Sequence, residues 1–483
     1  MYHIGTILTL TLALYALVMT VFLITENRRP QATLAWILVF VLAPVIGGLI
    51  YIFFGRDRKA FSKQARLLRQ DLEANALPLL APLFSRQDAE MARVEGESAS
   101  HRKLMKLVRR NSVSALTTRN HVEIQQNAAE FYPRMMEDMK AARHSIHLQY
   151  FIWAADPFTE TLKEILTAKA KAGIEVRLLY DPIGSQAHVG RAYVNDMRAA
   201  GIKMAVTSPL YRLHTISYRN HRKITVIDGA IGYTGGMNIG KEHLDGGEGF
   251  DSWRDTQLRI VGEGAAILQA VFMVDWYNAV RENLFFPQYF PTGATESTRD
   301  HVPVQILTSG PDSQWAAIRQ LYFFMIVTAQ RHIFLQSPYF IPDATIAEAL
   351  MSAALSGVDV KVMLSARPSG NRVPAWAGNT FMAEVVDAGV RVFLYEKGYL
   401  HAKTISIDSE ICSVGSANID IRSFSINYEL NAVLYSKQLA RELEQDFEAD
   451  LVYCSEFDAR EYQKRKPAVR FRDSVARIFS PLL

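Results

Sequence analysis

One motif occurs twice in this chain, and the repeat limits the fold more than any other feature. Each copy reads H-x-K-x4-D and is followed, ten residues after the Asp, by the Asn of a G-[GS]-x-N pattern. The members of the two copies are His221, Lys223, Asp228 and Asn238, and His401, Lys403, Asp408 and Asn418. All four positions repeat at one and the same offset along the chain. One copy is a weak pattern, but two copies in register predict a duplicated unit, because chance matches would have to coincide.

The segments that precede the motifs repeat as well, and they indicate the fold class. Residues 145–152, 158–172 and 175–180 read as strand, helix and strand, and residues 332–336, 346–355 and 359–364 repeat that order. Repetition on this scale is typical of domain duplication, and alternating strands and helices indicate an α/β sandwich. We therefore predict two tandem α/β/α halves, at residues 113–300 and 301–483, that form one pseudo-dimeric catalytic body.

The apolar excess of the chain is concentrated in its first 54 residues. No charged residue occurs in residues 4–24 or 32–54, and about 20 helical residues span the ~30 Å hydrocarbon layer. The first segment lacks the basic start and the small-residue cleavage site of a secretion signal. We therefore predict a two-helix transmembrane hairpin within residues 1–55. Basic residues between 56 and 69 outnumber those of the short loop, so the positive-inside tendency places the large C-terminal part in the cytoplasm.

Two basic stretches flank the predicted body. Residues 56–112 form a charged connector that contains the cationic run 101–110, and the tail is basic from Lys464 to Arg477. Either stretch could lie on an anionic bilayer or be the solvated face of a helix. The net charge of +4 is too mild to indicate nucleic-acid binding. Two cysteines, Cys412 and Cys454, argue against a disulfide framework and supply too few ligands for a cysteine zinc site.

Side-chain alternation assigns different tasks to the members of each motif. Residues 221–228 are rich in β-branched residues and end in Asp-Gly, which predicts a strand and a hairpin turn. On a strand, the His and Lys of a copy share one face, whereas the Asp, an odd number of positions away, faces the other side. We therefore expect Asp228 and Asp408 to complete the catalytic motifs by fixing the turn or the nearby backbone.

Together, the two copies supply the groups that phosphoryl transfer requires. Two imidazoles suit nucleophilic and acid–base work near neutral pH. Ammonium and N–H donors suit the non-bridging oxygens of a phosphoryl group. Besides the lysines, the candidate phosphate-binding residues are Asn238, Asn418 and Ser416. The motifs contain no carboxylate cluster for magnesium, so we expect no metal and assign its electrostatic role to the lysines.

These paired motifs resemble the HKD signature of the phospholipase D superfamily. The apolar N-terminal segments, residues 252–255 (SWRD) and residues 480–483 (SPLL) make the whole chain similar to the bacterial cardiolipin synthases. The resemblance implies two phospholipase D-like halves, no cofactor and a multi-pass protein of the bacterial inner membrane. It further implies that two phosphatidylglycerol molecules condense into cardiolipin and glycerol through a phosphohistidine.

The resemblance also implies roles for single residues. The histidine of the first half, His221, is the implied nucleophile, and His401 is the implied acid and base. A carboxylate some way downstream of each histidine is implied to orient its ring. Asp255 is the candidate that follows His221, and Glu429 is the candidate that follows His401.

Other functions would use the same residues. Phospholipid hydrolysis differs in having water as the acceptor, and the distinction depends on whether the pocket excludes water. A nuclease shares the phosphodiester chemistry, but the apolar N-terminus and the mild charge disfavour it. A membrane-tethered scaffold is disfavoured because both motif sets are intact. We expect phosphatidylglycerol and other anionic membrane phospholipids as partners, and no nucleic acid.

Overall fold

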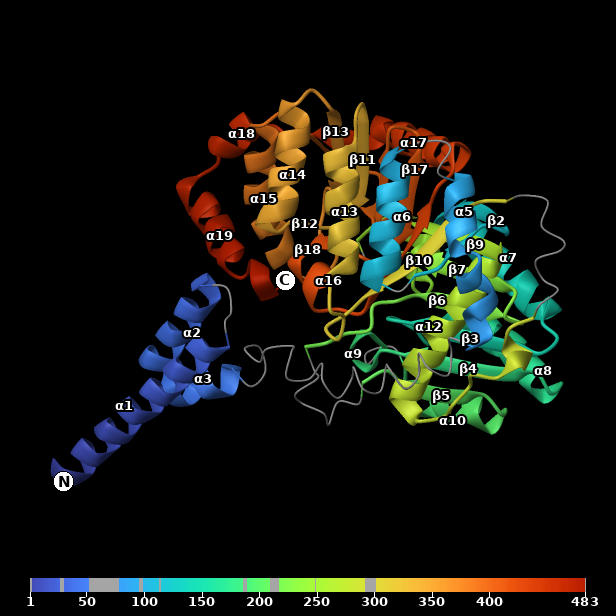
Figure 1. Cartoon of the computed structure of the whole chain (residues 1–483). Helices are drawn as coiled ribbons and strands as arrows, with labels where there is room; N and C mark the ends of the chain where they lie inside the picture. The colour runs from blue at the N-terminus through green and yellow to red at the C-terminus, as the bar shows by residue number, and fades with distance from the viewer. Residues whose placement is uncertain are drawn as a thin grey trace.

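Two α/β halves pack side by side, and the N-terminal helices project away from them (Figure 1). In this computed structural model, the described residues are 2–26, 30–51, 78–94, 99–112, 114–185, 189–208, 217–247, 249–291 and 301–482.

The N-terminal region consists of α1 (Tyr2–Thr25), α2 (Pro30–Leu42) and α3 (Pro44–Ile50). Leu23, Phe40 and Tyr51 form a small buried cluster between these helices. The sequence predicts two membrane-spanning helices, but in the part of the chain that the structure describes, none of the helices has both the length and the apolar character for a crossing. The predicted span 32–54 is divided at Pro44, because proline has no N–H to continue a helix and is well placed to begin a new one. Residues 52–54 and the basic cluster between 56 and 69 lie outside the described residues.

The first half is built on a seven-stranded sheet with the order β2-β9-β7-β6-β3-β4-β5. Its strands are β2 (Asn120–Gln126), β3 (Ser145–Tyr150), β4 (Glu175–Tyr180), β5 (Lys203–Val206), β6 (Ile224–Ile227), β7 (Ile231–Gly235) and β9 (Thr256–Gly262). Strands β3, β4 and β5 pair in parallel, as strand–helix alternation predicts. One face packs against α7 (Asn127–Ala141), α8 (Pro157–Lys171) and α10 (Arg191–Ala199). The other face packs against α12 (Glu263–Val280).

The second half repeats this arrangement in a nine-stranded sheet with the order β1-β10-β19-β17-β16-β11-β13-β14-β20. Its strands are β1 (Leu116–Thr117), β10 (Val304–Ser309), β11 (His332–Ser337), β13 (Asp359–Ser365), β14 (Arg391–Tyr395), β16 (Thr404–Ile407), β17 (Ile411–Gly415), β19 (Glu429–Leu434) and β20 (Cys454–Glu456). Helices α13 (Ala317–Thr328), α14 (Ala344–Leu355) and α15 (Val373–Val386) cover one face, and α17 (Lys437–Asp450) covers the other. One apolar core contains residues of both sheets and of α12 and α17, so the halves form a single body.

The connector and the motif strands differ from the sequence prediction. Strand β1 belongs to the second sheet, where it pairs with β10, although the sequence places its residues in the first half. The cationic run lies in α6 (Ala99–Ser112), whose apolar residues Leu104, Met105 and Val108 are buried in the core of the second half. The predicted motif strands begin only at Ile224 and Thr404. Each His-x-Lys segment therefore precedes its strand, so its backbone can form hydrogen bonds with a segment outside its own sheet.

Candidate active site

The aspartates of the two motifs fix the backbone beside the motif turns. Asp228 has a φ of 51°, and Asp408 has a φ of 56°. The Asp228 carboxylate accepts hydrogen bonds from the backbone N–H groups of residues 143, 144 and 145 at 2.8, 2.7 and 2.9 Å. The Asp408 carboxylate accepts from residues 330, 331 and 332 at 2.7, 2.7 and 3.0 Å. This confirms the role that side-chain alternation predicts: each aspartate ties its motif turn to the start of a neighbouring strand.

The segments around the two histidines pair with the opposite half. Strand β8 (Trp253–Arg254) pairs in parallel with β15 (Tyr399–Leu400), which leads directly into the second motif. The N–H of His401 then donates to the carbonyl of Arg254 at 2.7 Å, and the N–H of His221 donates to that of Tyr428 at 2.9 Å. These contacts place each motif histidine next to the carboxylate that follows its pairing partner in the chain.

The histidine–carboxylate pairs therefore cross between the halves. Nδ1 of His221 lies 3.1 Å from a carboxylate oxygen of Glu429, and Nδ1 of His401 lies 2.7 Å from a carboxylate oxygen of Asp255. Searching downstream of each motif predicts the opposite pairing, Asp255 with His221 and Glu429 with His401. That assignment is wrong, because the carboxylates follow strands that end at the interface of the halves. Both carboxylates are fully buried.

Two buried lysines lie beside the histidines. Nζ of Lys223 donates to the carbonyl of His221 at 2.7 Å, and Nζ of Lys403 donates to the carbonyl of His401. Burial lowers the pKa of Lys223 to about 7, with Glu429 opposing the shift and Lys403 adding to it. Burial lowers the pKa of Lys403 to about 8, with Asp255 and Glu429 opposing. An anion entering the site would favour the charged form of both lysines.

Burial also shifts the pKa values of the carboxylates and the imidazoles. Burial raises the pKa of Asp255, and the nearby Lys403 opposes that rise. Burial acts in the same direction on Glu429, but His221, Lys223 and a hydrogen bond from Ser416 outweigh it and lower the pKa of Glu429. Burial lowers the pKa of His221 and, together with both lysines, holds the pKa of His401 well below its usual value. The buried cations of the cluster, Lys223 and Lys403, would be stabilised further by an anionic ligand.

The glycine–serine difference between the motifs has a structural cause. A Cβ atom at Gly236 would lie 2.0 Å from the Asp255 carboxylate, so only glycine leaves room for that side chain. In the second half, the hydroxyl of Ser416 donates to Glu429 at 2.5 Å and accepts from the N–H of Leu430. The predicted phosphate-donor role of Ser416 is therefore not what the structure displays, because its hydroxyl proton is committed to Glu429.

The two motif asparagines have different partners. The amide oxygen of Asn238 accepts from the N–H of Ile152 at 3.1 Å, which fixes the plane of its amide. The amide of Asn418 donates to Asp420 at 3.1 Å, and its oxygen has no hydrogen-bond partner among the described residues. Among the described residues, none accepts a hydrogen bond from the amide N–H groups of Asn238, whereas Asn418 uses one of its two on Asp420.

Several residues around the site were not singled out by the sequence prediction. Aromatic rings cover the histidines: Phe151 contacts His221 with ring centroids 4.9 Å apart, and Trp253 and Tyr399 contact His401 at 5.5 and 5.8 Å. Trp253 does lie in the SWRD segment that carries the family resemblance. The aromatic rings shield the reacting groups from water, which strengthens electrostatic interactions between them.

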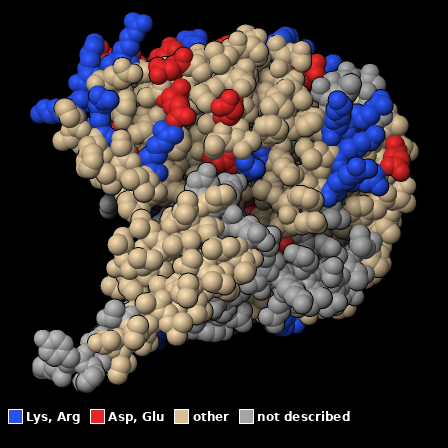
Figure 2. All heavy atoms as spheres, turned by 60° about the vertical axis from the view of Figure 1, so that its left-hand side comes forward, with Lys and Arg blue, Asp and Glu red and all other residues tan. Residues whose placement is uncertain are grey.

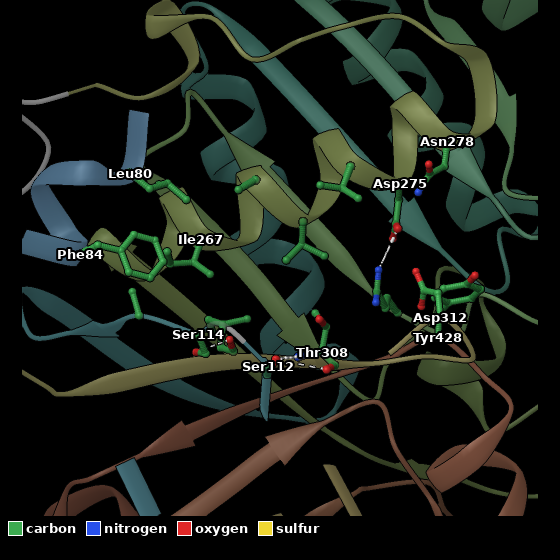
Figure 3. Close-up of a pocket in the computed structure, with 16 residues that line it drawn as sticks. Leu80, Phe84, Ser112, Ser114, Ile267, Asp275, Asn278, Thr308, Asp312 and Tyr428 are labelled. Carbon is green, nitrogen blue, oxygen red and sulfur yellow. Dashed lines mark hydrogen bonds and ion pairs between the residues drawn. The ribbon is translucent and has the colours of Figure 1, made fainter. Parts of the chain in front are cut away.

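Asp275 of α12 binds residues that flank the histidine of the first motif. Its carboxylate binds the guanidinium of Arg222 at 2.7 Å, the side-chain amide of Asn220 at 2.9 Å and that of Gln149 at 2.7 Å. It thus holds both sequence neighbours of His221. Figure 3 shows this carboxylate at one end of a cavity of about 140 Å³ between the halves, with Leu80, Phe84 and Ile267 toward the other end. No local sequence pattern identifies Asp275, because its partners belong to distant segments of the chain.

Considered together, the residues form one site made by both halves. Two imidazoles, each with a carboxylate on Nδ1, lie beside two buried lysines. Among the described residues, no group of three or more His, Cys, Asp or Glu side chains could hold a metal ion. The cluster is equipped to receive an anion, to bond covalently to it through an imidazole and to move protons.

Comparison with known proteins identifies the family of this chain. The family described as "Cardiolipin synthase, PLD-like domain" matches residues 135–253 and 322–451, that is, both halves, and the family described as "Phospholipase_D-nuclease N-terminal" matches residues 11–56. A cardiolipin synthase from Geobacillus kaustophilus is 39% identical over 467 residues, covering 95% of this chain and 90% of that protein. Cardiolipin synthase 2 from Bacillus cereus is 37% identical, covering 95% and 88%. The chain belongs to the cardiolipin synthase family.

Among solved structures, the fold is shared with a phosphatidylserine synthase from Haemophilus influenzae. The two superpose with a TM-score of 0.60 at 14% identity, covering 79% of this chain and all of that one. At this identity the likeness concerns the fold alone, and it supports the two-half architecture.

Proposed function

We propose that the protein is a phosphatidyltransferase that condenses two phosphatidylglycerol molecules into cardiolipin and glycerol. The observation that carries the proposal is the pair of imidazoles, each backed by a carboxylate of the opposite half, beside two buried lysines. The cardiolipin synthase relatives, which align over 95% of the chain, support the choice of substrate.

In the first step, Nε2 of His221 attacks the phosphorus of one phosphatidylglycerol. The bond between phosphorus and the head-group glycerol breaks as the N–P bond forms. The negative charge of the bound phosphodiester favours the protonated form of His401, and this ring gives its Nε2 proton to the departing glycerol oxygen. Glu429 and Asp255, on the Nδ1 side of the two rings, fix each tautomer and stabilise the positive charge that each imidazole carries during the cycle.

In the second step, a terminal hydroxyl of another phosphatidylglycerol takes the place of the glycerol. His401, now neutral, removes the hydroxyl proton while the oxygen attacks the phosphorus. The N–P bond breaks, cardiolipin leaves, and both histidines return to their starting protonation states. A second lipid as acceptor, in place of water, requires the dry surroundings that Phe151, Trp253 and Tyr399 give the histidines.

The lysines and Asn238 bind the non-bridging oxygens of the reacting phosphate. Lys223 and Lys403 are at most 1% exposed, so the attraction of their ammonium groups for an anion is weakly screened. The amide oxygen of Asn238 is fixed by Ile152, and this aims the amide N–H groups of Asn238 at the phosphate. Asn418 contributes its second N–H.

The N-terminal helices hold the enzyme in the bacterial inner membrane, with the catalytic body in the cytoplasm. Exposed large apolar side chains are concentrated on these helices: Ile7, Leu10, Leu14, Leu17, Val18, Val21, Phe22, Ile24, Leu34, Leu38, Val41, Leu42 and Ile46. An exposed apolar surface of this extent is typical of a contact with lipid or protein. Figure 2 shows the projecting helices as an uncharged surface, next to a body that carries Lys and Arg side chains.

An assay with purified components tests the function. The full chain in detergent, with phosphatidylglycerol as the only lipid and a chelator present, is expected to produce cardiolipin and free glycerol in equal amounts by mass spectrometry. Phosphatidic acid as the main product would identify a hydrolase instead. Loss of activity in the chelator would contradict charge stabilisation by the lysines, and cleavage of oligonucleotides at a comparable rate would favour a nuclease.

A further inference from the structure

A basin on the second half gathers arginines around an aromatic wall. Its volume is about 590 Å³. The arginines that line it are Arg367, Arg372, Arg465 and Arg472, and the aromatic residues are Phe250, Tyr339, Phe340 and Trp376. No aspartate or glutamate is among its lining residues in the described part of the chain.

The positive charge of this basin is largely uncompensated. Within the described residues, Arg472 alone of the four arginines forms an ion pair, with Asp473 at 2.6 Å. Arg367 lies over the ring of Phe250 at 4.9 Å, and Arg472 lies over Trp376 at 4.5 Å. Stacking on rings fixes the guanidinium planes but adds no negative charge. Arginines held around one hollow without acids are suited to binding a phosphate, whose oxygens match the guanidinium fork.

Tyr399 contacts both the wall of the basin and His401. The hydroxyl of Tyr399 donates to that of Tyr339, in the basin wall, at 3.2 Å. The ring of Tyr399 stacks on His401 at 5.8 Å, and Phe250 contacts the same tyrosine at 5.2 Å. Through Tyr399, the basin therefore borders the histidine that, in the proposed function, removes a proton from the acceptor lipid.

The chemistry of the acceptor lipid fits a phosphate-binding basin near His401. An attacking phosphatidylglycerol brings a phosphate of its own, joined to the reactive hydroxyl through its glycerol unit. That phosphate cannot occupy the lysine site, which holds the phosphoryl group being transferred, and it needs cations a short distance away. We propose that the basin binds the phosphodiester of the acceptor lipid and so selects a second phosphatidylglycerol over water or a neutral alcohol. This inference rests on the proposed function.

Two reactions of the full chain in mixed micelles separate the acceptor site from the donor site. Cardiolipin formation uses an acceptor that carries a phosphate. Exchange of labelled free glycerol into phosphatidylglycerol passes through the same first step, but its acceptor has no phosphate. The double variant Arg367→Gln/Arg372→Gln is expected to lower the ratio of cardiolipin formation to glycerol exchange by about tenfold or more. Arg367→Lys/Arg372→Lys, which keeps the charges, is expected to retain most of that ratio.

A matched control removes the same charge elsewhere on the second half. Arg441→Gln/Arg460→Gln changes two exposed arginines outside the basin, and its ratio of the two reactions should equal that of the unmodified protein. If the basin variant lowers both reactions equally, or neither, the basin is not the acceptor site. Absence of both reactions in the unmodified protein would refute the proposed function instead. Inorganic phosphate supplies a second measurement: it should inhibit cardiolipin formation more than glycerol exchange, and equal inhibition would also count against the basin.

Discussion

The two halves share one fold, but they accommodate the buried carboxylates beside the motif histidines in different ways. In the first half, Gly236 leaves space for Asp255, whose carboxylate then reaches His401. In the second half, Ser416 fills the equivalent place, and its hydroxyl holds Glu429 against His221. The two halves are therefore not interchangeable copies. Each supplies a histidine that only the other half can orient, so neither contains a complete catalytic pair.

The supporting residues are also unequal. Arg222, between the first histidine and lysine, is bound by Asp275, whereas Ala402 occupies the same place in the second motif. This difference fits a division of labour in which one histidine forms the covalent bond and the other moves protons.

The largest expected effect separates the two histidines. His221→Ala and His401→Ala are each expected to lower the rate of cardiolipin formation about 10⁴-fold or more, because the two rings act as a unit. A phosphodiester with a good leaving group needs no acid, so with this substrate His401→Ala should accumulate the phosphorylated enzyme, as detected by mass spectrometry of the intact protein. His221→Ala should not. The reverse result would exchange the two roles, and near-normal turnover in either variant would end the one-site mechanism.

The crossed carboxylates give the next largest effect. Asp255→Asn and Glu429→Gln are each expected to lower kcat about 10²-fold or more, because the tautomer and the charge of one imidazole lose their support. The informative measurement is the NMR titration of ¹⁵N-labelled histidines in detergent. Asp255→Asn should change the titration of His401 and leave that of His221 nearly unaltered. The opposite pattern would show that each carboxylate serves its own half.

Exchanging the glycine and the serine tests the packing difference directly. Gly236→Ser places a Cβ atom 2.0 Å from the carboxylate oxygen of Asp255, so Asp255 must move, and we expect activity to fall about 10²-fold. Ser416→Gly removes one hydrogen bond from Glu429, which corresponds to about tenfold in kcat/KM. Steady-state assays of both variants measure the difference. Equal losses would mean that the two positions are equivalent after all.

The pKa values of the two lysines predict that activity falls at alkaline pH. With pKa values of about 7 and 8 for Lys223 and Lys403, these groups lose their protons, and with them their positive charge, as the pH rises through that range. Because the charged lysines bind the phosphate, kcat/KM should fall above pH ~8 by about tenfold per unit at most for each lost proton. A pH profile in detergent at constant ionic strength tests this. A rate that keeps rising to pH ~10 would contradict it.

The smallest effect concerns the turn aspartates, where the halves agree. Asp228→Asn and Asp408→Asn each weaken a set of three backbone hydrogen bonds, and the free energy of unfolding should fall by about 1–3 kcal/mol in either variant. Thermal unfolding in detergent measures the loss, and the activity of the remaining folded protein should be largely retained. Inactive variants with an unchanged Tm would mean that these aspartates act on the substrate.

The sequence by itself determined the parts that depend on local order and on spacing. The constant offset between the two motif copies identified the duplicated fold and both His-x-Lys pairs. Alternation along the motif also predicted that Asp228 and Asp408 hold the backbone, because the period of an extended chain is set by its own geometry. Strand β4 was predicted to the residue, since Gly173 follows the end of the preceding helix and a mostly apolar segment comes next.

Only the tertiary structure decided which carboxylate meets which histidine. Asp255 and His401 are far apart in the sequence, as are Glu429 and His221, so no local period relates them. Their pairing follows from how two sheets dock and which strand ends then face each other. The same holds for Asp275, for the hydroxyl of Ser416 and for the arginine basin. Contacts of this kind depend on the packing of a whole core, because each is made by segments that meet only once the two halves are assembled.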